Sequence, residues 1–188
     1  MSRQAQPHVR LLLIAGTVFL AGCATTAATT GELSSRSQIA GGGARGDPLS
    51  GVTEFKLAQR STVPVPLAEA WPRLVKAYSD LGIPLTTVNA ADHRLGNEGM
   101  KRSHTVANDR ISTFLDCGTG GGGANADIYS VNMSVASRLQ TLTDSTTEVA
   151  TMVQATAAPM TFGTAPVVCS TLGSLEAKIA SLVAKGGK

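Results

Sequence analysis

Residues 129–136 read YSVNMSVA, and apolar and polar side chains alternate along them. Residues 149–157 (VATMVQATA) resume the alternation after a turn-like Thr143-Asp144-Ser145. A period of two places the apolar side chains on one face of a β-strand and the polar ones on the other. The two segments are therefore predicted to pair as an antiparallel hairpin with one face buried and one exposed.

A stretch with apolar residues at helical spacing precedes the hairpin. It covers residues 67–81 and meets a natural stop at Gly82. Pro72 lies inside it and is predicted to start or kink the helix locally, since proline lacks an amide proton. Trp71 falls on the apolar stripe and is predicted to anchor the helix in the core.

A second helical stretch follows the hairpin. Apolar residues recur at helical spacing between residues 172 and 183. Either Ser170 or Ser174 is expected to cap its start, and Gly186 to end it. Both helices present an apolar stripe, which must be buried against another layer.

The remaining segments complete the predicted fold class. Residues 89–99 and 116–127 are rich in turn residues, and the second of these is predicted to hold no regular structure. Short strands are predicted over residues 61–65, 85–88 and 111–115, the first at an edge because it contains a proline. The prediction is an α+β fold, an antiparallel sheet of about four to five strands packed against two helices.

The N-terminus has the features of a secretory signal peptide. Arg3 and Arg10 are followed by an apolar run over residues 11–20, LLLIAGTVFL. This run is shorter than the roughly 20 residues that a helix needs to cross a bilayer, and it matches the apolar region of a signal peptide. Residues 1–22 are therefore predicted to be a signal peptide that is absent from the mature chain.

Leu20-Ala21-Gly22-Cys23, at the end of that run, resembles the lipobox of bacterial lipoproteins. The resemblance implies that the Cys23 thiol receives a diacylglycerol and that cleavage before Cys23 frees an amine, which is then acylated. Two or more acyl chains hold a protein stably on a membrane. Ala24 follows the cysteine where an aspartate would stand for retention, which by the same resemblance implies the outer membrane, facing the periplasm.

A linker and one domain are predicted after the signal peptide. Residues 24–60 are rich in Ala, Thr, Gly and Ser and show no sustained apolar period, which is typical of a flexible linker. The lipidated Cys23 and a flexible, disordered tether thus cover residues 23–60, and a periplasmic α+β domain covers residues 61–185. The full chain has 16 Lys and Arg against 13 Asp and Glu, a mild charge that argues against nucleic acid as a partner.

The predicted order of elements is strand, helix, about four strands, helix. Together with the lipobox and the tether, this order resembles the helix-grip domains of periplasmic lipoproteins, among them the BamC-type accessory lipoproteins of the outer-membrane β-barrel assembly machinery. The resemblance covers residues 60–184 and involves no binding motif. It implies one helix-grip-like domain, where that family has two, and an envelope protein as its partner.

Cys117 and Cys169 are the cysteines that remain once Cys23 is lipidated. The periplasm is oxidising, and both cysteines follow strand-like segments beside turns of small residues. We therefore predict a Cys117–Cys169 disulfide. A reactive thiol or a redox pair is the alternative, but the sequence has no Cys-x-x-Cys motif that would favour it.

Residues 118–123 (GTGGGG) are predicted to be a connection between strands rather than a phosphate-binding loop, because no lysine follows the last glycine. Asp116 and Asp127 flank this segment, which leaves weak calcium binding as an alternative to solvated acids. His93 and His104 match neither a Cys–His nucleophile arrangement nor the spacing of a zinc site. The sequence thus predicts no catalytic residue, no metal site and no cofactor.

Arg94, Lys101, Arg102 and Arg110 form a modest basic cluster in the polar segment after the first helix. They are candidates for a partner surface, with a solvated loop as the alternative. The absence of a catalytic constellation favours a non-enzymatic interaction or accessory subunit of a cell-envelope assembly. A periplasmic module that binds a lipid or small ligand in an apolar cavity between helix and sheet is the second hypothesis. An enzyme is the third.

Overall fold

The predicted hairpin forms the centre of the fold. A computed structural model describes residues 54–160 and 165–186 of the chain. Strand β9 (Ser130–Thr143) pairs antiparallel with β10 (Thr146–Ala158) along the full length of both strands. The hairpin prediction is confirmed, and the strands extend beyond the alternating segments because their more polar ends continue the hydrogen-bonded ladder.

Five further strands join this hairpin in a seven-stranded sheet. Their bounds are β1 Gln59–Val63, β2 Thr87–Asn89, β3 Arg94–Arg102, β6 Leu115–Asp116 and β11 Val167–Thr171. β3 and then β2 extend the sheet beyond β9, while β1 and β11 share the other edge of β10 and β6 pairs with β11. The sheet is antiparallel, as predicted, but has seven strands rather than four to five.

Strand β3 occupies much of a segment, residues 89–99, that its polar and glycine-containing sequence predicts as turns. A Cβ at Gly96 would lie only 2.6 Å from the carbonyl oxygen of Val135 in β9, so glycine allows the close approach of the two strands. A bulge between Asn97 and Met100 absorbs the extra residues of β3. The turn prediction is therefore wrong for the residues that form β3, because glycine at this position allows close pairing with β9 rather than a turn.

The strand predicted over residues 111–115 is also wrong for most of its length. Residues Ile111–Thr113 form a short 3-10 helix, η2, and only Leu115 enters a strand, β6. Ile111 and Phe114 nevertheless bury their side chains. The apolar residues of this segment thus predict burial correctly, but a segment of five residues does not specify whether the backbone forms a strand or a helix.

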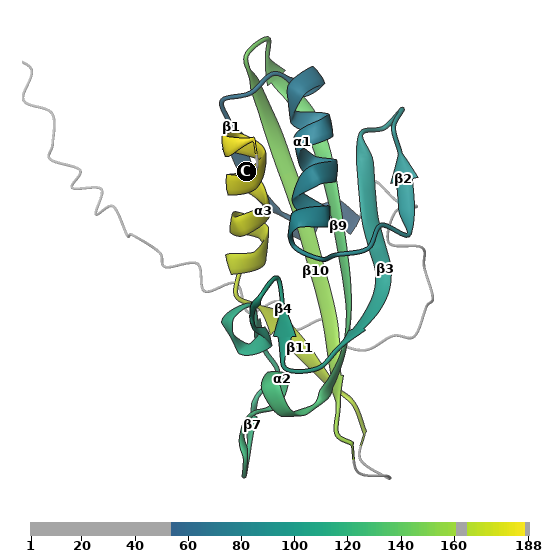
Figure 1. The fold of residues 1–188 in the computed structure, drawn as a ribbon, viewed down its shortest axis with the longest axis vertical. Helices are drawn as coiled ribbons and strands as arrows, with labels where there is room; N and C mark the ends of the chain where they lie inside the picture. Colours follow the sequence, from purple (N-terminus) through teal and green to yellow (C-terminus); the bar gives the residue numbers. More distant parts are fainter. Residues whose placement is uncertain (1–53, 161–164, 187–188) are drawn as a thin grey trace, which may run out of the picture. The chain divides into compact units, whose positions relative to one another are not determined.

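Two long helices, α1 (Leu67–Asp80) and α3 (Ser174–Lys185), lie side by side on one face of the sheet. In Figure 1, α1 lies in front of β9 and β10, and α3 lies beside it over β1. Their apolar stripes meet the inward side chains of the strands, as the period-two pattern requires. The most deeply buried side chains of this core include Leu74, Tyr78, Leu95, Val131, Met133, Leu175, Ile179 and Val183. The described part of the chain is therefore α+β.

The helix ends agree only partly with the predictions. α1 continues through Pro72, and α3 ends at Gly186, whose φ of 81° is the left-handed conformation typical of a helix C-terminus. The start of α3 has no serine cap, because Gly173 takes the cap position with a φ of 79°. Ser174 instead donates its hydroxyl to the Thr113 carbonyl oxygen at 2.6 Å.

The sheet face opposite α1 and α3, called here the outer face, carries a small second cluster. The 3-10 helix η1 (Glu54–Leu57) packs Phe55 on Ala136 and Ala150, which point away from the helices. β1 follows at Gln59, two residues before the domain start predicted at residue 61. The fold thus includes residues that composition alone assigns to the tether.

Residues 103–129, called here the insertion, connect β3 to β9. The elements not yet placed are β4 Thr105–Val106, β5 Asp109–Arg110, β7 Thr119–Gly120, β8 Gly123–Ala124 and the one-turn helix α2 Asn125–Ile128. β4 pairs with β5 and β7 with β8, each as a small antiparallel hairpin. The prediction that residues 116–127 hold no regular structure is therefore wrong. Glycine allows the tight β7–β8 turn, where Gly123 has a φ of 119°.

Candidate functional site

Four polar side chains meet in the insertion: His104, Arg110, Ser112 and Asp127. The Asp127 carboxylate accepts hydrogen bonds from the Ser112 amide at 2.9 Å and the Ser112 hydroxyl at 2.7 Å, and it pairs with Arg110 Nε at 3.1 Å. His104 Nδ1 lies 2.7 Å from the Asp127 carbonyl oxygen. Since a carbonyl oxygen only accepts, Nδ1 is the donor in this hydrogen bond.

Asp127 is held in its charged form. Burial by itself raises the pKa of this carboxyl, but the two hydrogen bonds from Ser112 and the Arg110 guanidinium outweigh it, so the pKa lies below the ordinary value. The carboxylate joins α2, which carries Asp127, to η2 and β5. Its three donors are protein groups on two neighbouring segments, which is the arrangement of a structural carboxylate rather than a calcium ligand.

The same contacts decide what chemistry this cluster supports. In a nucleophilic site the hydroxyl gives its proton to a histidine nitrogen, and an acid orients that histidine. Here the Ser112 hydroxyl donates to the Asp127 carboxylate, and His104 contacts the backbone of Asp127. Sequence analysis considered three of the four residues in unrelated roles and missed Ser112, because their meeting depends on the path of the insertion.

Cys117 and Cys169 lie at disulfide distance, with their sulfur atoms 2.03 Å apart, as predicted. Cys117 directly follows β6 and Cys169 lies in β11, two strands that pair with each other. Both cysteines are buried in the main core. The bond ties the insertion to the edge of the sheet, and it removes Cys117 as a nucleophile for the Cys–His arrangement considered above.

The four basic residues predicted as a partner surface lie in three places. Arg94 and Lys101 point to the outer face, as do the β9 residues opposite them in the ladder. Arg102 points to the helix side, where its guanidinium donates to the Gly82 carbonyl oxygen at 2.8 Å. Arg110 lies in the insertion, next to Asp127. Residues that are close in sequence are thus divided between two sheet faces by the alternation of β3.

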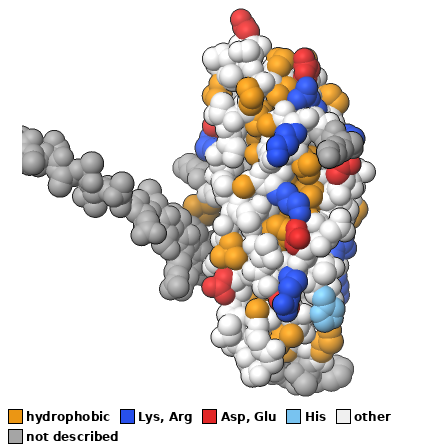
Figure 2. Space-filling model, turned by 60° about the vertical axis from the view of Figure 1, so that its left-hand side comes forward, with side chains coloured by type: hydrophobic (Ala, Val, Ile, Leu, Met, Phe, Trp, Pro, Cys, Tyr) orange, Lys and Arg blue, Asp and Glu red, His pale blue; other side chains and the backbone are white. Residues whose placement is uncertain are grey.

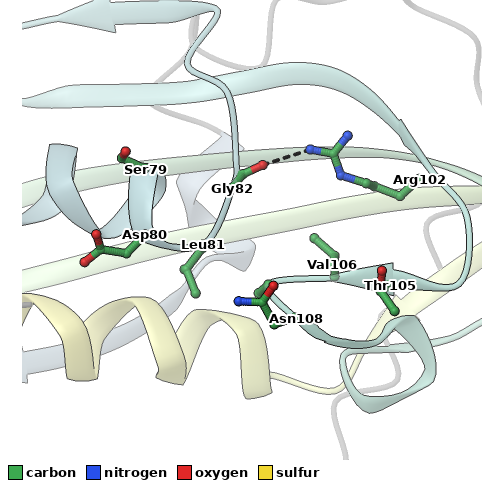
Figure 3. Close-up of a pocket in the computed structure, with 9 residues that line it drawn as sticks. Ser79, Asp80, Leu81, Gly82, Arg102, Thr105, Val106 and Asn108 are labelled. Carbon is green, nitrogen blue, oxygen red and sulfur yellow. Dashed lines mark hydrogen bonds between the residues drawn. The ribbon is translucent and has the colours of Figure 1, made fainter. Parts of the chain in front are cut away.

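A polar hollow of about 290 Å³ lies between the end of α1 and the β4–β5 hairpin (Figure 3). The bond from Arg102 to the Gly82 carbonyl forms part of its wall (Figure 3). The hollow is at the lower limit of small-molecule sites. It lies beside the helix–sheet interface, where the apolar cavity was expected, and its lining residues are Ser79, Asp80, Leu81, Gly82, Arg102, Thr105, Val106, Ala107 and Asn108.

A buried carboxyl group, Glu176, lies at the start of α3 with only 2% of the residue exposed. Its Oε1 accepts a hydrogen bond from the Thr171 hydroxyl at 2.6 Å, whereas Oε2 has no hydrogen-bond partner among the described residues. Burial raises the pKa of Glu176, and the bond from Thr171 opposes this only in part. Sequence analysis missed this buried glutamate, because a glutamate in the first turn of a helix is normally solvated.

The two histidines of the described chain are in separate environments. His93, in the turn before β3, meets Trp71 of α1 edge-on, with ring centroids 5.6 Å apart. Trp71 is half-buried against the main core, as predicted. His104 is in the insertion. Within residues 54–160 and 165–186, no three or more His, Cys, Asp or Glu side chains are placed to hold a metal ion.

Comparison with known proteins assigns neither a family nor a function to this chain. The chain matches no model of a protein family, and no curated protein sequence matches it. Among the helices of the described residues, none combines the length and the apolar character required to cross a membrane.

Proposed function

We propose that this chain is a bacterial lipoprotein, anchored in the outer membrane through acyl chains on Cys23, whose α+β domain faces the periplasm as a non-enzymatic accessory subunit of an envelope assembly. The lipobox-like Leu20-Ala21-Gly22-Cys23 supports the anchor. The observation that carries the proposal is the Cys117–Cys169 pair at disulfide distance, which suits a chain exported to an oxidising compartment.

The candidate catalytic side chains are already engaged by partners within the domain, which supports a binding role rather than catalysis. The Ser112 hydroxyl and the Asp127 carboxylate satisfy each other, and the cysteines are joined. Large apolar side chains are exposed near the insertion and along the adjoining edge of the sheet, where a protein partner would cover them. They are Ile128, Met160, Val168 and Leu172. A helix-grip-like domain of the BamC type is the narrower form of this proposal.

Replacement of Cys23 by serine tests the anchor. We expect the native protein to incorporate an alkyne-tagged fatty acid and to sediment with outer membranes, and the Cys23→Ser variant to lose both properties. Thr25→Ser, two residues beyond Cys23, is the matched control and should leave both properties intact. A Cys23→Ser protein that is labelled and sediments like the native one would overturn the proposal.

A complex in detergent tests the partner role. The lipidated full chain, extracted gently from its own membranes, should migrate in a native gel as a complex of defined stoichiometry larger than the chain alone. Leu172→Glu and Val168→Glu should return it to the size of the free protein, whereas Leu142→Glu, at the far end of the hairpin, should not. A native chain that migrates alone would contradict the accessory role.

A periplasmic ligand-binding module is the second candidate, and the hollow beside Arg102 is the observation that favours it. Its polar lining suits a small polar ligand rather than a lipid chain. Native mass spectrometry of the purified protein should then show a bound small molecule that is lost in Arg102→Ala. Spectra in which both proteins carry no added mass would exclude this candidate.

A further inference from the structure

The guanidinium of Arg102 is fixed in the wall of the hollow between α1 and the β4–β5 hairpin. It donates to the Gly82 carbonyl oxygen at 2.8 Å and to the Lys101 carbonyl oxygen at 3.2 Å. The bond to Gly82 offsets the negative pole at the end of α1. A guanidinium has five N–H donors, so these two bonds leave three for other groups. Among the residues that the structure describes, no carboxylate pairs with Arg102.

The other charged groups beside the hollow are neutralised in pairs. Lys76 Nζ lies 2.8 Å from both carboxylate oxygens of Asp80, the acidic residue of the lining. At the hairpin, Lys178 pairs with Asp109 at 2.5 Å. Basic and acidic side chains are likewise interspersed on the face of the molecule that Figure 2 shows. The hollow therefore has a net positive charge, which comes from Arg102.

Three further side chains of the lining have polar ends that bond to no described residue. They are Ser79 at the end of α1 and Thr105 and Asn108 of the hairpin. A hydroxyl and a side-chain amide can each donate a hydrogen bond. Figure 3 shows Thr105 and Asn108 across the hollow from the bond between Gly82 and Arg102. A molecule in the hollow would thus meet hydrogen-bond donors on both walls.

The hairpin that forms one wall is held in position by contacts outside the hollow. His104 donates through Nδ1 to the Asp127 carbonyl oxygen at 2.7 Å, and Lys178 donates to the Ala107 carbonyl oxygen at 3.1 Å. Ala107 takes a left-handed φ of 52°, which a residue with a Cβ seldom adopts, and its side chain is buried in the core. The donors are therefore positioned before a ligand arrives, as in a preformed site.

From the fixed guanidinium and the donors around it we infer that the hollow binds a small oxyanion, a molecule that carries a carboxylate or phosphate group beside hydroxyl groups. This inference rests on the proposed ligand-binding module and names the class of its ligand. The guanidinium fork matches the oxygen atoms of either anion. Ser79, Thr105 and Asn108 suit the hydroxyl groups, and a volume of about 290 Å³ limits the ligand to a small molecule.

Charge decides between an oxyanion and other small polar molecules. Hydrogen bonds from a guanidinium to an ionised acceptor are about twice as strong as bonds between neutral groups. A neutral sugar would bond Ser79, Thr105 and Asn108 without using the charge of Arg102, and a cation would be repelled by that charge. An anionic ligand is therefore the class that uses every free donor of the lining.

Nuclear magnetic resonance titration of the full chain in a neutral detergent tests the inference with matched probes. Glucuronate and glucose differ by a carboxylate in place of a hydroxymethyl group, and glycerol 3-phosphate and glycerol make the same comparison for phosphate. We expect saturable shifts of the Arg102 Nε–H and of the hairpin amides with both acids. Each acid should bind more tightly than its neutral partner, by about tenfold or more, and should bind more weakly as salt is added.

Variants of the lining make the test specific. Arg102→Gln keeps a donor for the Gly82 carbonyl oxygen but removes the charge, so it should abolish the preference for acids. Thr105→Val lies at an exposed position, where folding is least at risk, and should weaken acid binding by about threefold. Lys101→Gln is the matched control, because this neighbouring cation of β3 points to the outer face and should leave binding unchanged.

Equal affinity for glucuronate and glucose would overturn the inference, as would acid binding that Arg102→Gln retains. Titrations in which no acid shifts the residues of the hollow would overturn it too. In each case the ligand-binding role is judged separately by native mass spectrometry. A co-purified neutral molecule would preserve that role and refute the oxyanion, whereas a native chain without added mass would refute the role itself.

Discussion

Three hydroxyl side chains are buried in the core and form a chain of hydrogen bonds. The Tyr78 hydroxyl bonds the Ser137 hydroxyl at 2.9 Å, which bonds the Thr151 hydroxyl at 2.8 Å. Burial raises the pKa of Tyr78 far above its usual range, so the chain of hydroxyls stays neutral. Because these three hydroxyls satisfy one another, they hold α1 on β9 and β10 by hydrogen bonds within the core.

Glu176 gives a prediction at this scale. Its folded-state pKa is raised above 4.5 by burial, so the native protein is stabilised fully below that pH and loses stability as the pH rises through the folded-state pKa. Glu176→Gln keeps an acceptor for Thr171 and carries no charge. We expect the variant to be more stable than the native protein at pH 7 and equally stable near pH 4.

Urea denaturation at both pH values measures this difference. Glu69→Gln, an exposed glutamate in the first turn of α1, is the control and should not show a gain that depends on pH in this direction. Equal pH dependence of Glu176→Gln and the native protein would show that Glu176 is solvated in the folded state.

Strand β3 depends on a close approach to β9 at Gly96. A Cβ at Gly96 would lie 2.6 Å from the Val135 carbonyl oxygen and 3.0 Å from the Cα of Ala136, both backbone atoms of β9 that cannot rotate away. Gly96→Ala should therefore separate the two strands and cost about 1–3 kcal/mol. Gly99→Ala is the matched control in the same strand, because its nearest contact would be an ordinary 3.6 Å to Asn132 Oδ1.

Thermal and urea denaturation of the two variants check this prediction. We expect a clear loss of stability for Gly96→Ala and a small change for Gly99→Ala. A Gly96→Ala protein as stable as Gly99→Ala would mean that β3 does not approach β9 as closely as the structure shows.

Elements differ in how far the sequence predicts them. The helices and the β9–β10 hairpin were predicted because each contains many residues with one consistent period. β3 was not, since its glycines and polar residues are typical of turns and their role depends on a partner strand far along the chain. Isolated apolar residues, as in residues 111–115, predict burial but not whether the backbone forms a strand or a 3-10 helix.

For the whole molecule, the Cys117–Cys169 bond joins the insertion to the edge of the sheet across 52 residues of sequence. On the loop-entropy model, a loop of this length stabilises a protein by about 4 kcal/mol through the unfolded state. Cys117→Ala/Cys169→Ala should therefore lower the free energy of unfolding by about that amount. Urea denaturation of the native protein with and without a reducing agent should reproduce most of the loss, and equal stability in all cases would contradict it.

The sequence by itself determined the α+β class, the central hairpin, both long helices and the pairing of the two cysteines. It did so because periodicity is a local property and because few cysteines were available to pair. Only the tertiary structure decided that Ser112 meets Asp127, that Glu176 is buried, and that neighbouring basic residues of β3 point to opposite faces. Those outcomes depend on strand register and on contacts between segments far apart in the chain, and no local pattern records them.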